Sequence, residues 1–284
     1  MPEVIFWRDR FCAADEVRIP PFDRGHNFGD GIYEYVRAYG GRPFMLAEHL
    51  ARFERSAREI RMDPPLPRER LDEIVREAIA RAGGDVTDAY FQATRGAPAF
   101  RNHPFPEGAE PIFFLHAKPA RARTPEERAR GVSAVLAPDE RWARCDIKSL
   151  NLLPNVLAAQ KAKEAGAYEA IFVRDGRVTE CAHSSVLAVM EDVLRTAPLT
   201  DNILPSITRA EVLRLAREEG VPVEERAFSP EELRRATECI IASTVAEVLP
   251  CVQVDASPVG DGKPGPVTRR LAEAFDELTG SDGA

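Results

Sequence analysis

Lys148, Glu180 and two hydroxyl-containing turns are the residues whose types and spacing suggest chemistry. Lys148 lies in the run DIKSLNLLPNVLAAQKAKEAG, which leads from a short extended segment into a helix. Glu180 ends a later extended segment, AYEAIFVRDGRVTE, and the turns Ser206–Thr208 and Ala242–Thr244 stand at the edges of regular elements. An amine for a Schiff base, an anion for a pyridinium nitrogen, and hydroxyl and amide donors for a phosphate predict a pyridoxal phosphate site.

Each of these residues also has an ordinary structural interpretation. Lys148 alone would be a solvated surface lysine, but Ile147 and Leu150 give it apolar neighbours. Such neighbours disfavour the charged ammonium and make the amine available as a nucleophile, although a lysine with a buried stem and a solvated head fits equally. Glu180 alone fits a solvated carboxylate at a hairpin end, and the turns fit common helix caps.

Basic residues in two further segments are considered as ligands of an anion. Arg101 and His103 are two positions apart in a proline-rich loop, so both can point to one side and hold a carboxylate; a solvated basic loop is the alternative. Arg52 lies between Glu48 and Arg55 on the polar face of an amphipathic helix. Its spacing alone assigns it to the surface, in a ladder of ion pairs.

The bulk composition narrows the class of protein. The chain has 284 residues, 44% hydrophobic and 30% charged, with a net charge of −8 and no long basic block, which argues against nucleic acid as a partner. The start carries charges and no apolar stretch long enough for a signal peptide or a membrane span, so we expect a cytoplasmic protein without a membrane partner. Five scattered cysteines with no C-x-x-C pair argue against a zinc or disulfide framework, and we expect no metal.

The order of predicted elements favours an α+β fold, because hairpins and helices come in separate runs. Hairpins are expected around Asp175-Gly176 and Glu191-Asp192, and a strand at EVRIP near the start. A charged, proline-containing stretch without apolar period predicts a linker at residues 119–126. We therefore expect an N-terminal α+β domain over 1–118 and a C-terminal α+β domain over 127–284 that carries the Schiff-base lysine.

The motifs DRGHNFGDGIYEYV, EHLARFERSAREI, ERWARCDIKSLNLLPNVLAAQKA, ILPSITR and STVAEVLP together resemble the class IV, or fold type IV, pyridoxal-phosphate aminotransferases. Within them the chain is most similar to bacterial D-amino-acid transaminases, and the similarity spans nearly the whole chain. The resemblance implies a two-domain α+β fold with pyridoxal 5'-phosphate between the domains. It also implies a homodimer in which the loop with Arg101 and His103 reaches the neighbouring site.

The resemblance also implies a role for each candidate residue. Lys148 would be the Schiff-base lysine and proton shuttle, and Glu180 the partner of the pyridine nitrogen. The phosphate would be held by Arg52, Ile207, Thr208 and Thr244, with Ser243 beside it. Leu204 would pack on the cofactor ring, and Arg141 would approach its phenolic oxygen. The substrate α-carboxylate would be held by Tyr33, Arg101 and His103.

The activity implied is ping-pong transamination between a D-amino acid of the D-alanine or D-glutamate type and a 2-oxo acid such as 2-oxoglutarate or pyruvate. Departures occur after Glu180, where Cys181–Ser185 replace the glycine and small hydroxyl residues usual in the family, and His183 could replace a serine near the phosphate or point away. The alternatives are a branched-chain L-amino-acid transaminase, an aminodeoxychorismate lyase, an R-selective amine transaminase and a non-catalytic protein that kept the fold.

Overall fold

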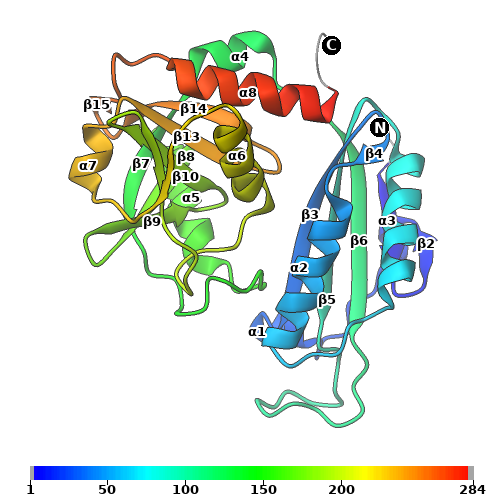
Figure 1. Cartoon of the computed structure of the whole chain (residues 1–284). Coiled ribbons are helices and arrows are strands. Elements are labelled where there is room, and N and C mark those ends of the chain that lie inside the picture. Colours follow the sequence, from blue (N-terminus) through cyan, green and yellow to red (C-terminus); the bar gives the residue numbers. More distant parts are fainter. Residues whose placement is uncertain (1–2, 281–284) are drawn as a thin grey trace. The chain divides into compact units, whose positions relative to one another are not determined.

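The computed structural model describes residues 3–280, which divide into two compact units (Figure 1). The first unit is formed by the chain up to Ala122 together with Ile147–Asn151. The second is formed by Arg123–Asp146 and by the chain from Leu152 onward. No helix within residues 3–280 combines the length and the apolar composition that crossing a membrane requires.

The first unit is a six-stranded antiparallel sheet in the order β2-β1-β6-β5-β3-β4. Its strands are β1 (Val4–Trp7), β2 (Arg10–Cys12), β3 (Gly31–Tyr39), β4 (Arg42–Pro43), β5 (Val86–Thr94) and β6 (Ile112–Ala120). Its helices are the 3₁₀ turn η1 (Ala14–Glu16), α1 (Arg24–Phe28), α2 (Leu46–Glu59) and α3 (Arg68–Ala82).

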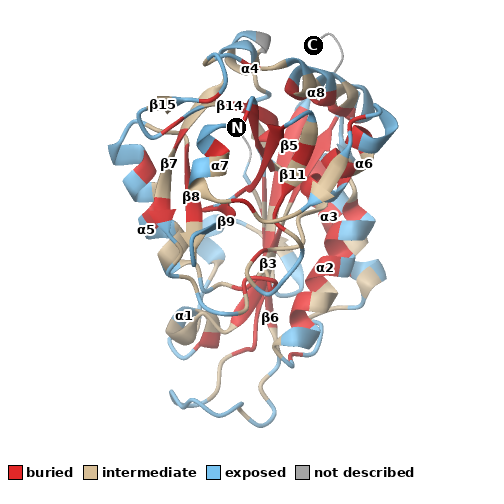
Figure 2. Ribbon diagram, turned by 60° about the vertical axis from the view of Figure 1, so that its left-hand side comes forward, coloured by how far each residue is buried: buried red, intermediate tan, exposed pale blue. Residues whose placement is uncertain are grey.

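The core of the first unit lies between the sheet and helices α2 and α3. Apolar residues recur three and four positions apart on both helices, as Leu50, Phe53 and Ala57 show on α2. They pack with alternate residues of the strands, among them Ile32 of β3 and Phe91 of β5. Figure 2 shows that α2 and α3 each carry a buried and an exposed side.

The second unit is a curled nine-stranded mixed sheet in the order β12-β11-β10-β13-β14-β7-β8-β9, with β15 paired to β14. Its strands are β7 (Val132–Pro138), β8 (Glu169–Arg174), β9 (Arg177–Cys181), β10 (Ser185–Met190), β11 (Val193–Thr196), β12 (Val223–Glu225), β13 (Glu238–Ser243), β14 (Glu247–Val254) and β15 (Ser257–Pro258). Its helices are α4 (Pro125–Arg130), α5 (Leu153–Glu164), α6 (Ile207–Glu218), α7 (Pro230–Arg234) and α8 (Pro266–Thr279).

Local signals account for the turns that shape the second unit. Asp175 and Gly176 both have positive φ and join β8 to β9, and Glu191 and Asp192 do the same between β10 and β11. Both predicted hairpins and the α+β class are confirmed. The strand predicted at EVRIP is wrong: Glu16 ends the η1 turn, and Arg18–Pro20 form no strand. Pro20 and Pro21 have no main-chain N–H to contribute to a sheet.

The predicted domain division and the structural units differ at one place. The chain leaves the first unit after Ala122, within the predicted linker, but Ile147–Asn151 return to the first unit. Main-chain contacts explain the return: Ser149 forms a bridge with Ile32, and Leu150 N donates to Gly31 O at 3.0 Å. Lys148 therefore lies in the first unit and not, as predicted, in the body of the C-terminal domain.

Candidate active site

Lys148 is fixed by its main chain between β3 and α2. Its carbonyl accepts from Tyr33 N at 3.0 Å, and its amide donates to Ser56 Oγ at 3.3 Å. The partly buried side chain places Nζ 4.3 Å from the centre of the Tyr33 ring. No carboxylate of the described residues forms an ion pair with this amine, so it is held by an aromatic face and remains available for reaction.

Arg52 is buried, so the surface position that its spacing suggested is wrong. Its Nε and Nη2 donate to the two carboxylate oxygens of Glu34 at 2.7 and 2.9 Å, and the carboxylate has no exposed surface. His49 Nδ1 lies 2.8 Å from the same carboxylate. Burial alone would raise the pKa of Glu34, but the charge of Arg52 and the contact with His49 outweigh it and hold that pKa below its ordinary value.

Glu34 was missed in the sequence, although a signal was present. It alternates with Ile32 and Val36 on β3, so a charged residue stands on the apolar face of the strand. A carboxylate at such a position requires a buried partner, and Arg52 supplies it. The phosphate role that the resemblance implied for Arg52 stays a prediction.

Arg101 and His103 lie in the exposed loop between β5 and β6, and the structure brings them together on one ring. The Arg101 guanidinium carbon is 4.3 Å from the centre of the Phe28 ring, and the His103 ring centre is 5.1 Å from it. The expectation that the two side chains share one side of the loop agrees with this arrangement. Tyr33, the third predicted carboxylate ligand, packs against Tyr90 with ring centres 5.7 Å apart.

Glu180 is the residue before the last of β9 in the second unit, and it is buried. Its Oε2 accepts from the main-chain amide of Leu204 at 3.1 Å, and its Oε1 forms an ion pair with Arg141. Leu204 and Glu180, which the resemblance placed on the same cofactor ring, are thus in direct contact. The approach of Arg141 to a phenolic oxygen stays a prediction; in this structure its guanidinium pairs with carboxylates.

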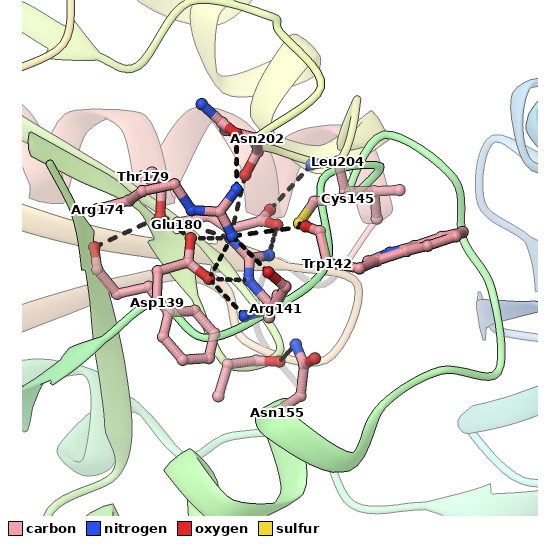
Figure 3. A network of polar contacts seen from close by, with 12 residues as sticks. Asp139, Arg141, Trp142, Cys145, Asn155, Arg174, Thr179, Glu180, Asn202 and Leu204 are labelled. Carbon is pink, nitrogen blue, oxygen red and sulfur yellow. Dashed lines mark hydrogen bonds and ion pairs between the residues drawn. The ribbon is translucent and has the colours of Figure 1, made fainter.

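Asp139 holds Arg141 in place and was missed in the sequence. Its side chain has no exposed surface, and it accepts from Arg141 Nε and Nη2 at 2.8 Å, from Arg174 at 3.0 Å and from the Thr179 hydroxyl at 3.0 Å. Burial acts to raise the pKa of Asp139, but Arg141 and Arg174 hold it below its ordinary value. Figure 3 shows these side chains converging beside Glu180.

The two predicted hydroxyl turns lie on neighbouring elements of the second unit, because α6 packs against β13. Ser206 caps α6 by accepting from Arg209 N at 3.1 Å, while no described residue accepts from the amides of Ile207 and Thr208 in the first turn.

At the end of β13, Ser243 Oγ accepts from Ala246 N at 3.1 Å and closes a turn that contains Thr244. Unpaired amides at a helix start beside threonine hydroxyls suit a phosphate, which is the fit that the predicted cofactor requires.

His183 contacts Glu169 of β8. Its Nδ1 contacts the carboxylate of Glu169, which has no exposed surface, while the His183 side chain is 59% exposed. Burial acts to lower the pKa of His183, but the contact with Glu169 outweighs it and raises that pKa above its ordinary value. Glu169 was not singled out in the sequence, and its place at the start of an apolar strand was the available signal.

Residues 31–254 match the amino-transferase class IV family. The chain belongs to this family. Its relatives include the D-alanine aminotransferase of Staphylococcus haemolyticus, 43% identical over 274 residues with 96% of each chain covered. That of Bacillus licheniformis is 41% identical over 284 residues, covering 99% of this chain and 98% of the relative.

Among solved structures, the branched-chain amino acid aminotransferase from Thermobaculum terrenum in its PLP form is similar, with a TM-score of 0.85 at 27% identity. The match covers 98% of this chain and 94% of that one. The family predicted from the motifs is confirmed.

Proposed function

We propose that this class IV amino-transferase moves the amino group of a D-amino acid, of the D-alanine or D-glutamate type, to a 2-oxo acid such as 2-oxoglutarate or pyruvate. The proposal rests on a sequence identity of 41% to 43% with D-alanine aminotransferases over nearly the whole chain. The similar branched-chain aminotransferase structure has 27% identity. The loop with Arg101 and His103 supports the same choice.

The cofactor of the proposed reaction is pyridoxal 5'-phosphate, which supplies an aldehyde for the amino group and a ring that stores negative charge. Lys148 would hold it through its side-chain amine and, once released by the substrate, would take the α-proton and return it. The absence of a described carboxylate partner supports this, because an ion-paired ammonium would have to break that pair before reacting.

The Glu180 carboxylate would accept a hydrogen bond from the protonated ring nitrogen of the cofactor. Its position between Arg141 and the Leu204 amide fixes the carboxylate and supports the role, since each carboxylate oxygen can accept a further hydrogen bond. The phosphate would be bound by the amides and hydroxyls of two turns and by one guanidinium. These residues are Ile207, Thr208, Ser243, Thr244 and Arg52.

The substrate α-carboxylate would be held by Tyr33, Arg101 and His103. In the proposed homodimer the loop with Arg101 and His103 contributes both side chains to the active site of the neighbouring chain. The exposure of both side chains on a loop fixed at its base supports this arrangement. The proposed location of the enzyme is the cytoplasm.

The proposal is tested by mixing the purified enzyme, loaded with cofactor, with 2-oxoglutarate and either D-alanine or L-leucine. Release of pyruvate from D-alanine, with L-leucine inert, is expected. Activity with L-leucine and none with D-alanine would instead identify a branched-chain transaminase. Pyruvate elimination from aminodeoxychorismate, or turnover of amines that lack a carboxylate, would indicate the two remaining enzyme alternatives.

A further inference from the structure

Helix α1 lies against the loop between β5 and β6 that carries Arg101 and His103. Its first residue, Arg24, is buried and donates to three successive main-chain carbonyls of that loop. The distances are 2.6 Å to Asn102 O, 3.0 Å to His103 O and 3.3 Å to Pro104 O. Because a guanidinium is a rigid planar fork, these bonds fix the path of the chain on both sides of His103.

Phe28, the last residue of α1, contacts the two side chains that this stretch carries. The Arg101 guanidinium stands over its ring at 4.3 Å, and the His103 ring lies tilted at 42° with centres 5.1 Å apart. The Arg24 guanidinium is 4.9 Å from the same ring. One aromatic ring thus limits the directions of Arg101 and His103, which are otherwise exposed.

Helix α1 is itself fixed to the base of the loop. Asp23 caps the helix by accepting from His26 N at 2.9 Å, and it also accepts from the Thr94 hydroxyl at the end of β5 at 2.6 Å. A Cβ at Gly25 would come within 2.3 Å of Thr94 Cγ2, so glycine permits this close packing. Helix α1 is therefore attached to the end of strand β5, from which the loop continues.

A second anchor comes from the carboxylate of Asp30. It accepts from Arg24 Nε at 2.7 Å and from Arg95 Nε at 2.8 Å. The Arg95 guanidinium in turn lies 3.8 Å from the centre of the Phe105 ring, farther along the same loop. Asp30 thus orients two arginines that hold the loop at two separate points.

We propose that Arg24 and Phe28 are positioning residues that set the directions of Arg101 and His103 and so build the binding site for the substrate α-carboxylate. This inference rests on the proposed transamination of D-amino acids. Arg24 does not touch the substrate: it acts through the carbonyls of residues 102–104, and Phe28 acts through the two side chains.

Three single variants test the proposal in the cofactor-loaded enzyme. Arg24→Lys keeps the charge and loses the fork, and Phe28→Leu removes the ring. Arg37→Lys is the matched control, because Arg37 is buried like Arg24 and pairs with a carboxylate, that of Asp88, at 2.7 and 2.9 Å. Arg37 lies in β3, six residues or roughly 20 Å along the strand from its first residue, Gly31.

The expected result is a change in KM and not in kcat. Arg24→Lys should raise the KM for D-alanine about tenfold and Phe28→Leu about threefold, with kcat within about threefold of the wild type, because hydrogen bonds and a cation–π contact are lost away from the reacting atoms. Arg37→Lys should leave KM unchanged. A KM in Arg24→Lys no higher than in the control would overturn the proposal.

A double-mutant cycle separates a positioning effect from a general structural one. If Arg24 acts through Arg101, then adding Arg24→Lys to the Arg101→Ala enzyme should leave its KM within about twofold. Full additivity of the two effects would mean that Arg24 acts by another route and would contradict the inference.

Limited proteolysis gives a readout that does not depend on activity. Trypsin should cleave after Arg101 about tenfold faster in Arg24→Lys than in the wild type or in Arg37→Lys, since the bonds to the loop carbonyls restrict the local opening that a protease requires. Equal cleavage rates would show that Arg24 does not anchor the loop. If the wild type fails to transaminate D-alanine, the proposed function is wrong, and cleavage alone decides whether Arg24 anchors the loop.

Discussion

Arg52 donates to both oxygens of the Glu34 carboxylate, at 2.7 and 2.9 Å, and Glu34 has no exposed surface. Helix α2 and strand β3 are joined at this point by a fully formed ion pair. One turn farther along α2, Ser56 Oγ accepts from the main-chain amide of Lys148. The proposed cofactor lysine and the proposed phosphate ligand thus depend on the same face of one helix.

Replacing Glu34 by Gln should destabilise the protein strongly, because it leaves the buried Arg52 charge without its partner. Loss of about 3–5 kcal/mol in the free energy of unfolding is expected. Urea unfolding followed by circular dichroism measures it. The control is Glu54→Gln, which breaks the more exposed pair with Arg68 and should cost less than about 1 kcal/mol. Equal losses in the two variants would contradict the importance of the buried pair.

Glu180→Gln should lower the kcat for D-alanine on the order of 100-fold, because an amide cannot stabilise a protonated ring nitrogen as a carboxylate does. Cofactor binding through Lys148 should survive and is followed by the visible absorbance. Glu191→Gln is the control, since Glu191 is an exposed carboxylate in the turn between β10 and β11. An unchanged kcat in Glu180→Gln would remove Glu180 from the mechanism.

The pair of His183 and Glu169 predicts a pH dependence of stability. The pKa of His183 is raised in the folded protein. The ion pair therefore stabilises the fold fully below the pKa of histidine in the unfolded chain, about 6.5. This stabilisation is lost as the pH rises through the pKa of His183 in the folded protein. His183→Gln should therefore lose more stability, relative to the wild type, at pH 6 than at pH 9. Urea unfolding at several pH values checks this, with the exposed His26→Gln as control. A stability difference that does not change with pH would rule out the ion pair.

Arg101→Ala should raise the KM for D-alanine at least about tenfold while changing kcat less, because a charge-assisted contact to the substrate carboxylate is removed and the reacting atoms are not touched. Initial rates over a range of D-alanine concentrations measure both constants. An Arg101→Ala enzyme that keeps the wild-type KM would show that the loop does not hold the carboxylate.

Local sequence signals predicted much of the fold. The hairpins at Asp175-Gly176 and Glu191-Asp192 depend on positive φ angles, which Gly176 adopts readily and Asp175 and Asp192 adopt more easily than most residues, and helix α6 begins at its Ser206 cap. The return of Ile147–Asn151 to the first unit could not be predicted, because it depends on main-chain bonds to β3, far away in sequence.

The candidate site residues could likewise be found in the sequence from their types, but the residues that hold them in place could not. Lys148 and Glu180 stand out in the sequence, but Asp139 and Arg24 look like ordinary surface charges until the strands that surround them are placed. Arg52 was assigned to the surface by its spacing for the same reason, since helical periodicity does not show that Glu34 lies beneath it. Buried ion pairs join distant segments, so spacing within one segment can show that a charged residue is buried but not which residue is its partner.

The most direct test of the account is to identify the lysine that holds the cofactor. The chain has five lysines, Lys118, Lys148, Lys161, Lys163 and Lys263, and Lys148 is at least 13 residues away from each of the others. Borohydride reduction of the cofactor-loaded enzyme, followed by peptide mass mapping, should place the reduced cofactor on Lys148 alone, and Lys148→Ala should lose both the label and D-alanine transamination. A label on another lysine, or full transamination by Lys148→Ala, would contradict the central claim.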